Sequence, residues 1–528
     1  MKVTNPILRG FHPDPCIIRV NDDYYMATST FQWFPGVELY HSKDLVNWEI
    51  LPSPLSRTTQ LDLKGVPNSC GVWAPCLSYS DGTFYLIYTV VRDFQRKFID
   101  LKNYLVTTND LLGEWSEPIY LNASGFDPSL FHDDDGKKYL VNMLMDFRDG
   151  KSLFGGIVLQ EYSPTEQKLV GKPTNIYKGT SVGITESPHI YKKDGYYYLM
   201  VAEGGTLYDH GTQLARSKNL MGPYESDPEP ILTTRHAPDA PLQRTGHSSL
   251  VDTPDGRSYV SFLCGRPLLD EKKKRRNCIL GREACLTEVI WKDGWLRLKD
   301  GGVVPPLTYE SSLPEHTFEE VNDQVIFDQP TLPAQFKTLR VPFEQIGSLS
   351  DRPGFLRLYG HESITSFFDL SMVARRLNCF CVQATTKLFF TPENMQQSAG
   401  LTVYYDSFNF FYLYVTADEE GETELRILVS DNLKFYNPIE HFSIPINHAS
   451  PIWLRVNIDE LSLEFSYSLD GDRFVTIGGK LNCSNISDEA YSEIGFQGHT
   501  GTFVGVTCQD LSGGNLPADF ANFSYIRK

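Results

Sequence analysis

The sequence predicts an all-β protein in which a five-bladed β-propeller is followed by a C-terminal β-sandwich. A unit of turn and strand recurs five times before residue 300, and alternating apolar and polar residues continue beyond it without that repeat. Aromatic residues make up 13% of the 528-residue chain, and they pack well on pleated sheets. A chain of this length is expected to form more than one domain, each with its own core.

The repeated unit is a hairpin signal of the form Asp-Gly-x-x-Tyr followed by apolar residues. It occurs four times after a degenerate first copy, and successive tyrosines are 60, 54, 59 and 61 residues apart. Asp-Gly between apolar segments is a strong sign of a β-hairpin. Five units of several short strands predict five blades around one axis. The tyrosines that mark the units are Tyr25, Tyr85, Tyr139, Tyr198 and Tyr259.

A second recurring element predicts a tight turn between the outer strands of three units, ending at Trp48, Trp115 and Tyr224. The units end near the Pro-containing stretch 301–306. In the region that follows, residues 461–469 alternate strictly between apolar and polar side chains, as in a half-buried strand of a sandwich. We therefore expect the propeller over residues 1–305, a linker over 306–325 and the sandwich over 326–528.

Composition and charge limit the partners. A net charge of -18 opposes binding to nucleic acid or anionic membranes, which reward clustered Lys and Arg, whereas a neutral sugar remains compatible. The sequence shows neither an apolar stretch of about 18 residues nor a signal-peptide core, so we expect a cytoplasmic location. The ten cysteines lack metal-ligand spacing, and we expect buried, reduced thiols rather than a disulfide framework or a metal site.

Five chemically distinctive residues share one register of the repeat. Each lies 11 or 12 residues before the marker tyrosine of its unit, on the strand that precedes the hairpin. Equivalent positions of a closed ring point to the same place, so these side chains are expected to converge at the propeller axis. The residues are Asp14, Trp73, Asp127, Glu186 and His247.

Each of these residues also has an ordinary structural interpretation. Asp14-Pro15 and Asp127-Pro128 resemble plain turns, Trp73 alone suits a core, and His247 alone suits a hydrogen-bonded structural role. The shared register favours a site instead, because acids buried together raise one another's pKa and are tolerated mainly at functional sites. Glycoside hydrolysis needs such a set, with one protonated carboxyl and one ionised carboxylate.

The motifs around these residues resemble glycoside hydrolase family 43, and closely its two-domain β-xylosidases, over essentially the full chain. The resemblance implies the propeller, the sandwich and inversion at the anomeric carbon. It implies an exo-acting enzyme that releases xylose from the non-reducing end of short β-1,4-xylo-oligosaccharides. The matching segments are 5–15, 73–75, 125–129, 185–189, 246–248 and 280–283.

By this resemblance, Asp14 is expected to be the general base and Glu186 the general acid, while Asp127 orients Glu186 and keeps its pKa high. Arg282 is expected to hold Asp127 ionised and to bind sugar hydroxyls. Further substrate contacts are expected from Phe31 and Trp73 as aromatic walls, and from Thr206 and His247.

The resemblance also bears on cofactors and on the second domain. A divalent cation such as calcium is compatible with the surroundings of His247 but is not required, and calcium prefers six to eight oxygen ligands. The sandwich is expected to close the pocket, with 501–505 matching the family and His499 standing where relatives often carry an aromatic residue. Because an imidazole can change charge between about pH 5 and 8, our hypothesis is that His499 affects the leaving-group preference and the pH profile. Relatives associate as homo-oligomers, which we expect here too.

Alternatives stay open at this stage. The main activity could be that of an α-L-arabinofuranosidase, because both substrates present a pentose to the same axis. A non-catalytic carbohydrate-binding propeller or a scaffold propeller would not need three acids in register. The basic run Lys272–Arg276 is interpreted as a solvated loop near the pocket rim, one that could also bridge subunits.

Overall fold

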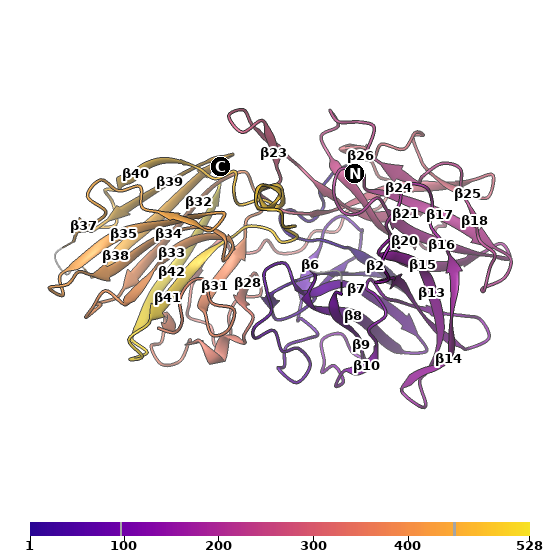
Figure 1. Ribbon diagram of the computed structural model, residues 1–528, viewed down its shortest axis with the longest axis horizontal. Coiled ribbons are helices and arrows are strands. Elements are labelled where there is room, and N and C mark those ends of the chain that lie inside the picture. Colours follow the sequence, from indigo (N-terminus) through magenta and orange to yellow (C-terminus); the bar gives the residue numbers. More distant parts are fainter. Residues whose placement is uncertain (96–97, 447–449) are drawn as a thin grey trace.

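The computed structural model consists of two β-rich lobes, one formed by the first 310 or so residues and the other by the C-terminal part (Figure 1). It describes residues 1–95, 98–446 and 450–528. Within these ranges the helical elements are two short 3-10 helices, η1 (Phe343–Gln345) and η2 (Asp488–Ile494). No helix in the described ranges has the length and apolar character to cross a membrane.

The N-terminal lobe contains five antiparallel four-stranded sheets, which confirms the predicted blades. β19 (Leu232–Thr233) adds a short strand to the fourth blade. In chain order the blades are β2 (Cys16–Val20), β3 (Asp23–Thr28), β5 (Glu38–Ser42), β6 (Glu49–Leu51); β7 (Gly71–Ser80), β8 (Thr83–Asp93), β9 (Asp100–Thr108), β10 (Ile119–Asn122); β11 (Ser129–His132), β12 (Lys138–Met145), β13 (Phe154–Ser163), β14 (Lys168–Tyr177); β15 (Thr185–Lys193), β16 (Tyr196–Glu203), β17 (Gly211–Ser217), β18 (Glu225–Ser226); β20 (Gln243–Asp252), β21 (Ser258–Gly265), β24 (Glu283–Lys292), β25 (Trp295–Leu298).

The first strands of the blades form a closed ring. β2 contacts β7, β7 contacts β11, β11 contacts β15, β15 contacts β20, and β20 contacts β2. Each Asp-Gly turn joins a first strand to a second strand, and Gly82 at one such turn has the positive φ of 80° that this hairpin geometry favours. The segments ending at Trp48, Trp115 and Tyr224 join the third and fourth strands of their blades, as predicted.

The C-terminal lobe is a sandwich of two antiparallel sheets, as predicted. The first sheet runs β29 (Gly347–Ser348), β30 (Leu356–Tyr359), β42 (Pro517–Arg527), β32 (Cys381–Phe389), β38 (Ile452–Asp459), β39 (Ser462–Ser468), β40 (Val475–Asn482), with β27 (Gln324–Ile326) also on β42. The second runs β36 (Lys434–Tyr436), β35 (Thr423–Asp431), β34 (Asn409–Ala417), β33 (Gln397–Asp406), β41 (Phe503–Asp510), β31 (Ser371–Arg376), β28 (Phe336–Leu339), β4 (Trp33–Phe34), with β37 (Ile444–Pro445) also on β35.

The two lobes share a sheet. β4 comes from the propeller part of the chain, yet it pairs with β28 at the edge of the sandwich, and the Trp33 ring stacks on Phe503 at 3.7 Å between centroids. Nearby, the buried Glu38 carboxylate pairs with Lys337 at 3.0 Å and Arg376 at 2.6 Å. Buried charges are stable only when paired in this way, so the interface fixes one relative placement of the lobes.

Two small sheets complete the described structure. β1 (Lys2–Thr4) pairs with β26 (Thr308–Glu310), which ties the chain that leaves the propeller back to its N-terminus. β22 (Leu268–Asp270) and β23 (Arg275–Asn277) form a hairpin that extends from the fifth blade. Figure 1 shows β23 reaching across toward the sandwich, beside the short helix between the lobes.

Candidate active site

The five residues that share the repeat register lie on, or directly before, the first strands of the five blades. Trp73, Glu186 and His247 belong to β7, β15 and β20, whereas Asp14 and Asp127 stand two residues before β2 and β11. Because these strands form the closed ring, their corresponding ends surround the axis. The five positions therefore converge at the propeller axis, as predicted.

The backbone is irregular at these positions. The pairing of β15 with β16 skips between Glu186 and His189, and β7 and β20 have similar register shifts. Asp14, Asp127 and His247 adopt positive φ values of 57°, 53° and 55°. Bulges and left-handed residues turn side chains out of the regular alternation of a strand, and they concentrate at functional sites.

All nine residues singled out from the sequence line one cavity of about 570 Å³. It lies at the axis and is bounded on one side by Gly495, Gln497 and His499 of the sandwich lobe. The predicted residues at this cavity are Asp14, Phe31, Trp73, Asp127, Glu186, Thr206, His247, Arg282 and His499.

Asp14 is held as a carboxylate. Its Oδ1 accepts from Arg282 Nη1 at 2.9 Å, and its Oδ2 accepts from the Ser29 hydroxyl at 2.5 Å. His247 Nδ1 lies 3.5 Å from Oδ1. Burial alone would raise the pKa of Asp14, but Arg282, His247 and Ser29 outweigh it and hold the pKa below its ordinary value. Asp14 is thus ionised at neutral pH.

Glu186 and Asp127 behave in the opposite way. Burial, followed by the negative charge of Asp14, raises the pKa of Glu186 to about 7. Burial and the neighbouring Glu186 and Asp14 raise the pKa of Asp127 well above its ordinary value, against one hydrogen bond from the Ser187 backbone N–H at 3.1 Å. The cavity therefore combines one ionised carboxylate with two acids that retain protons much more readily.

Arg282 differs from its expected pairing. It was predicted to hold Asp127 ionised, but its Nη1 binds Asp14 and also donates to Thr206 Oγ1 at 3.4 Å. Its Nη2 donates to the His499 backbone oxygen at 2.9 Å. Arg282 also lowers the pKa of Asp127, but burial and the neighbouring Glu186 and Asp14 outweigh it, so Asp127 is not held ionised.

An aromatic wall stands beside the acids. The Trp73 ring lies 5.9 Å from Phe31, 5.4 Å from Phe94 and 5.6 Å from Phe126, measured between centroids. Trp73 Nε1 donates to the Ser69 carbonyl oxygen at 3.0 Å, which fixes the indole. Apolar ring faces of this kind pack against the hydrophobic face of a pyranose.

His499 completes the wall from the sandwich lobe. Its ring lies 5.8 Å from Trp73 and 5.2 Å from Phe94, and its backbone N–H donates to Ser69 Oγ at 3.0 Å. Burial, with the nearby Arg282 and Arg244 charges, lowers the pKa of His499 to about 3. This imidazole therefore does not change charge between about pH 5 and 8, because burial disfavours the charged ring, and the hypothesis of a pH effect by that route is wrong.

The surroundings of His247 give a divalent cation little support from side chains. Burial lowers the pKa of His247, and Arg282 acts in the same direction. Within the described residues, His247 is not part of any cluster of three or more His, Cys, Asp or Glu donor atoms within 4.8 Å of one another. Since calcium takes six to eight oxygen ligands, these side chains do not form a calcium site on their own, and a cation there stays a prediction.

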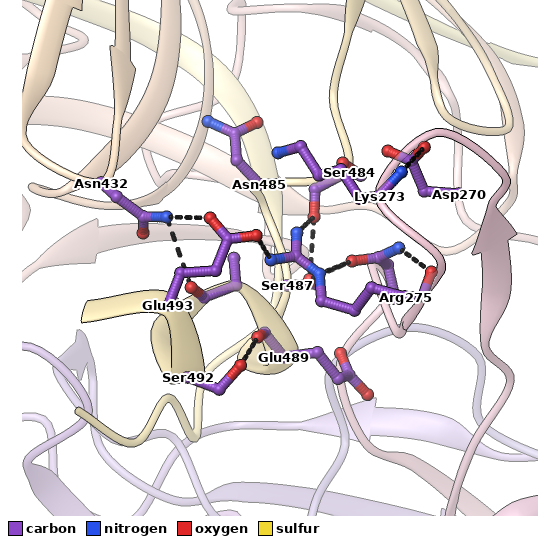
Figure 2. Close-up of polar contacts among 12 residues, drawn as sticks. Asp270, Lys273, Arg275, Asn432, Ser484, Asn485, Ser487, Glu489, Ser492 and Glu493 are labelled. Carbon is purple, nitrogen blue, oxygen red and sulfur yellow. Dashed lines mark hydrogen bonds and ion pairs between the residues drawn. The ribbon is translucent and has the colours of Figure 1, made fainter. Parts of the chain in front are cut away.

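The sandwich wall of the cavity is anchored by η2. Arg275 of β23 pairs with Glu493 of η2, and its Nη2 donates to the Ser484 carbonyl oxygen at 3.2 Å (Figure 2). The other Glu493 oxygen accepts from Asn432 Nδ2 at 3.1 Å. Arg275 is therefore not solvated as the sequence suggested, and Arg276 likewise donates to the Pro238 carbonyl oxygen at 2.7 Å.

Sequence reasoning missed three contributors to the cavity region. Ser29 binds Asp14, while Phe94 and Phe126 extend the aromatic wall. Phe126 was visible as the neighbour of Asp127, but Ser29 and Phe94 lie outside the shared register, on segments that follow second strands. No periodic signal marks such positions.

This pocket combines an ionised carboxylate, carboxyl groups with raised pKa values and aromatic ring faces. Glycoside hydrolases use such a combination. The family model for glycosyl hydrolases family 43 matches residues 3–296, and the model for the β-xylosidase C-terminal concanavalin A-like domain matches residues 324–526. The chain belongs to family 43 of the glycosyl hydrolases, which confirms the resemblance in its motifs.

Relatives are similar along their whole length. A β-xylosidase of Bacillus subtilis (strain 168) is 48% identical, with 100% of both chains covered. Xylosidase/arabinosidase 43B of Humicola insolens is 46% identical, covering 99% of this chain and 97% of the relative. The crystal structure of a xylan β-1,4-xylosidase from Bacillus halodurans C-125 has a TM-score of 0.95 at 50% identity and covers 99% of each chain.

Proposed function

We propose that this chain is an exo-acting, inverting β-xylosidase that releases xylose from the non-reducing end of short β-1,4-xylo-oligosaccharides. The observation that carries the proposal is the different setting of two carboxyl groups in one cavity. Asp14 is bound by Arg282 and Ser29, whereas Glu186 is desolvated beside the Asp14 charge. Two carboxyl groups whose pKa values are pushed apart are suited to act as base and acid.

In this proposal the ionised Asp14 is the general base. It takes a proton from a water molecule as that water attacks the anomeric carbon from the face opposite the leaving group. Arg282 and Ser29 keep the carboxylate ionised and fixed in direction before the attack. The configuration at carbon 1 inverts, so a β-linked substrate gives α-xylose as the first product.

Glu186 is the general acid. It donates its proton to the glycosidic oxygen as the bond breaks, and a pKa of about 7 keeps a large fraction protonated in neutral solution. After turnover Glu186 takes up a proton and Asp14 releases one, so the protons balance. Asp127, whose raised pKa reflects the same crowding, acts as a positioning residue that supports the protonated state of this pair.

Two features support exo action on a pentose. The sandwich segment that contains Gln497 and His499 closes one side of the cavity, which favours chain ends over internal positions. Trp73 and Phe31 offer ring faces for a single sugar. Xylose as the sugar is supported by the names of the Bacillus relatives, and the name of the Humicola relative keeps arabinose as the second candidate. The proposed steps use side chains alone and need no divalent cation.

The test is hydrolysis of xylobiose by the purified chain, followed by NMR of the anomeric proton in the first product. We expect α-xylose to appear before mutarotation, and Asp14→Ala to abolish its release. Initial β-xylose would overturn the inverting mechanism. Turnover of an arabinofuranoside without turnover of xylobiose would contradict xylose as the substrate sugar but would leave the proposed mechanism unaffected.

A further inference from the structure

A second group of reactive side chains lies one layer further along the propeller axis. Cys16, Cys76 and His189 follow the cavity positions Asp14, Trp73 and Glu186 by two or three residues on β2, β7 and β15. One donor atom from each, two sulfurs and an imidazole nitrogen, all lie within 4.8 Å of one another. The residues are far apart in sequence, so only the closing of the propeller brings them together.

The distances match those of a metal-binding set. Cys16 Sγ lies 3.8 Å from Cys76 Sγ, and Cys76 Sγ lies 4.0 Å from His189 Nδ1. At Zn–S and Zn–N lengths of about 2.3 and 2.0 Å, tetrahedral angles place two sulfurs about 3.8 Å apart and sulfur and nitrogen about 3.5 Å apart. The separation of the two sulfurs already fits, the Cys76–His189 separation is about half an ångström too long, and the Cys16 and His189 donor atoms lie within 4.8 Å of each other.

The surroundings provide an entry path and support for the imidazole. A cavity of about 510 Å³, distinct from the catalytic one, is lined by these three residues together with Ser129 and Ser249. The His189 ring stacks on Tyr191 with 6.3 Å between centroids. The Tyr191 hydroxyl is fixed in turn by the Leu250 backbone N–H at 2.8 Å. The Tyr191 ring therefore packs beside the imidazole and limits its rotation.

We propose that Cys16, Cys76 and His189 form a binding site for a thiophilic metal ion, with Zn²⁺ as the ion that fits the ligand set. Two thiolates and a neutral imidazole suit Zn²⁺ and leave a fourth position for water. Binding releases the two thiol protons to solvent, and the two thiolates neutralise the ion, so no net charge is added to the axis. This site is separate from the proposed hydrolysis and does not depend on it.

The site has a consequence for the fold. Asp14 directly precedes β2 and Glu186 lies near the start of β15, and Cys16 and His189 follow them on these two strands. An ion held by both strands would link them directly. Because the three ligands meet only in the folded propeller, Zn²⁺ is expected to bind the folded chain more tightly than the unfolded chain and so to raise the unfolding temperature.

The chain contains a matched comparison. Cys264 Sγ and Cys285 Sγ lie 3.2 Å apart on β21 and β24, and both are buried. Within the described residues, no third His, Cys, Asp or Glu donor completes a cluster around this pair. A pair of adjacent buried thiols is thus present with and without an imidazole, which separates metal binding from mere thiol proximity.

The experiment uses the full chain, reduced and kept free of oxygen. Co²⁺ serves as the spectroscopic probe, and Zn²⁺ is then added to displace it. We expect sulfur-to-cobalt charge-transfer absorption that saturates at one equivalent, disappears in Cys16→Ser and Cys76→Ser, and persists in Cys264→Ser. His189→Gln should weaken Zn²⁺ binding by about 100-fold or more, since even outer partners of a metal site contribute 10- to 100-fold.

X-ray absorption of the Zn²⁺-loaded native chain gives a measurement that no folding defect can affect. We expect two sulfur and one nitrogen scatterers at about 2.3 and 2.0 Å. The proposal is overturned by absorption that does not saturate at one equivalent, by absorption that survives both Cys16→Ser and Cys76→Ser, or by a zinc shell without sulfur.

Discussion

Arg282 Nη2 donates a hydrogen bond to the backbone carbonyl oxygen of His499 across the boundary between propeller and sandwich, at 2.9 Å. The same guanidinium binds Asp14 through Nη1 at 2.9 Å. The sandwich thus contributes more than a wall to the cavity. Through one carbonyl group it fixes the direction of the cation that keeps Asp14 ionised, which makes the catalytic geometry a property of both domains.

Replacing Arg282 with lysine tests this arrangement. A single ammonium group cannot reach Asp14, Thr206 and the His499 carbonyl oxygen at once, because it lacks the planar fork of guanidinium. We expect kcat to fall by about 100-fold, similar to the loss of one well-placed donor. The pKa of Asp14 should rise, so the acidic limb of kcat/KM should move to higher pH. An unchanged acidic limb would contradict the assigned role.

The pH profile on the alkaline side reports Glu186. A general acid must be protonated, and burial and the charge of Asp14 raise the Glu186 pKa to about 7, although Arg282 acts in the opposite direction. We expect kcat/KM on xylobiose to fall as pH rises through about 7. In Asp14→Asn, NMR titration of the Glu186 carboxyl should show a lower pKa than in the native chain, because the Asp14 charge that raises it is removed. An alkaline limb of kcat/KM that follows the titration of a surface group instead would contradict the assignment of Glu186 as the general acid.

Substrates with different leaving groups distinguish the role of the general acid from that of the general base. Glu186→Gln removes the proton donor, so hydrolysis of xylobiose should fall by about 100- to 10,000-fold. Hydrolysis of a dinitrophenyl xyloside should fall far less, because its leaving group departs without protonation. Asp14→Asn should abolish both reactions, since water activation is needed in each. Steady-state kinetics on the two substrates measure this, and equal losses in Glu186→Gln would exclude it as the acid.

These roles could be anticipated to different extents from the sequence. Asp14, Asp127 and Glu186 share a repeat register, and a ring of equivalent strands converts that register into proximity. Phe94 and Ser29 carry no such mark, because they lie where the chain leaves a second strand and local turns decide their direction. The pairing of Arg282 with Asp14 instead of Asp127 depends on which carboxyl the guanidinium reaches in the folded site, and the repeat register does not show this.

Phe94 provides a test of the part that the sequence missed. Its ring lies 5.4 Å from Trp73 and 5.2 Å from His499, so Phe94→Ala should loosen the aromatic wall. Aromatic pairs contribute about 0.5–1.5 kcal/mol each, which corresponds to an increase in KM of roughly 2- to 10-fold with a smaller change in kcat. Phe98→Ala is the matched control, because Phe98 is 69% exposed and is not among the cavity residues. Equal effects of the two variants on KM would contradict a role of Phe94 in the aromatic wall.

The anchoring of η2 can be tested with two acids on the same short helix. The Asp488 carboxylate accepts from Arg244 Nη2 at 2.7 Å, and the Arg244 side chain is 0% exposed. Glu493 pairs with Arg275, but its side chain is 44% exposed. The first pair lies inside the interface between the lobes and the second at its rim, so the two replacements differ mainly in desolvation.

Asp488→Asn leaves the Arg244 charge in the interface with Glu489 as its remaining carboxylate, at 3.3 Å. Breaking a buried pair costs about 3–5 kcal/mol, whereas an exposed pair is worth about 1 kcal/mol or less. Chemical denaturation should therefore show a large loss of stability in Asp488→Asn and a small one in Glu493→Gln. Because Arg244 Nε also donates to the Thr206 carbonyl oxygen at 3.1 Å, Asp488→Asn should raise KM as well. Similar unfolding midpoints for the two variants would mean that Glu489 alone is enough to pair Arg244 in the interface, and that the Asp488 pair contributes little to holding the sandwich on the propeller.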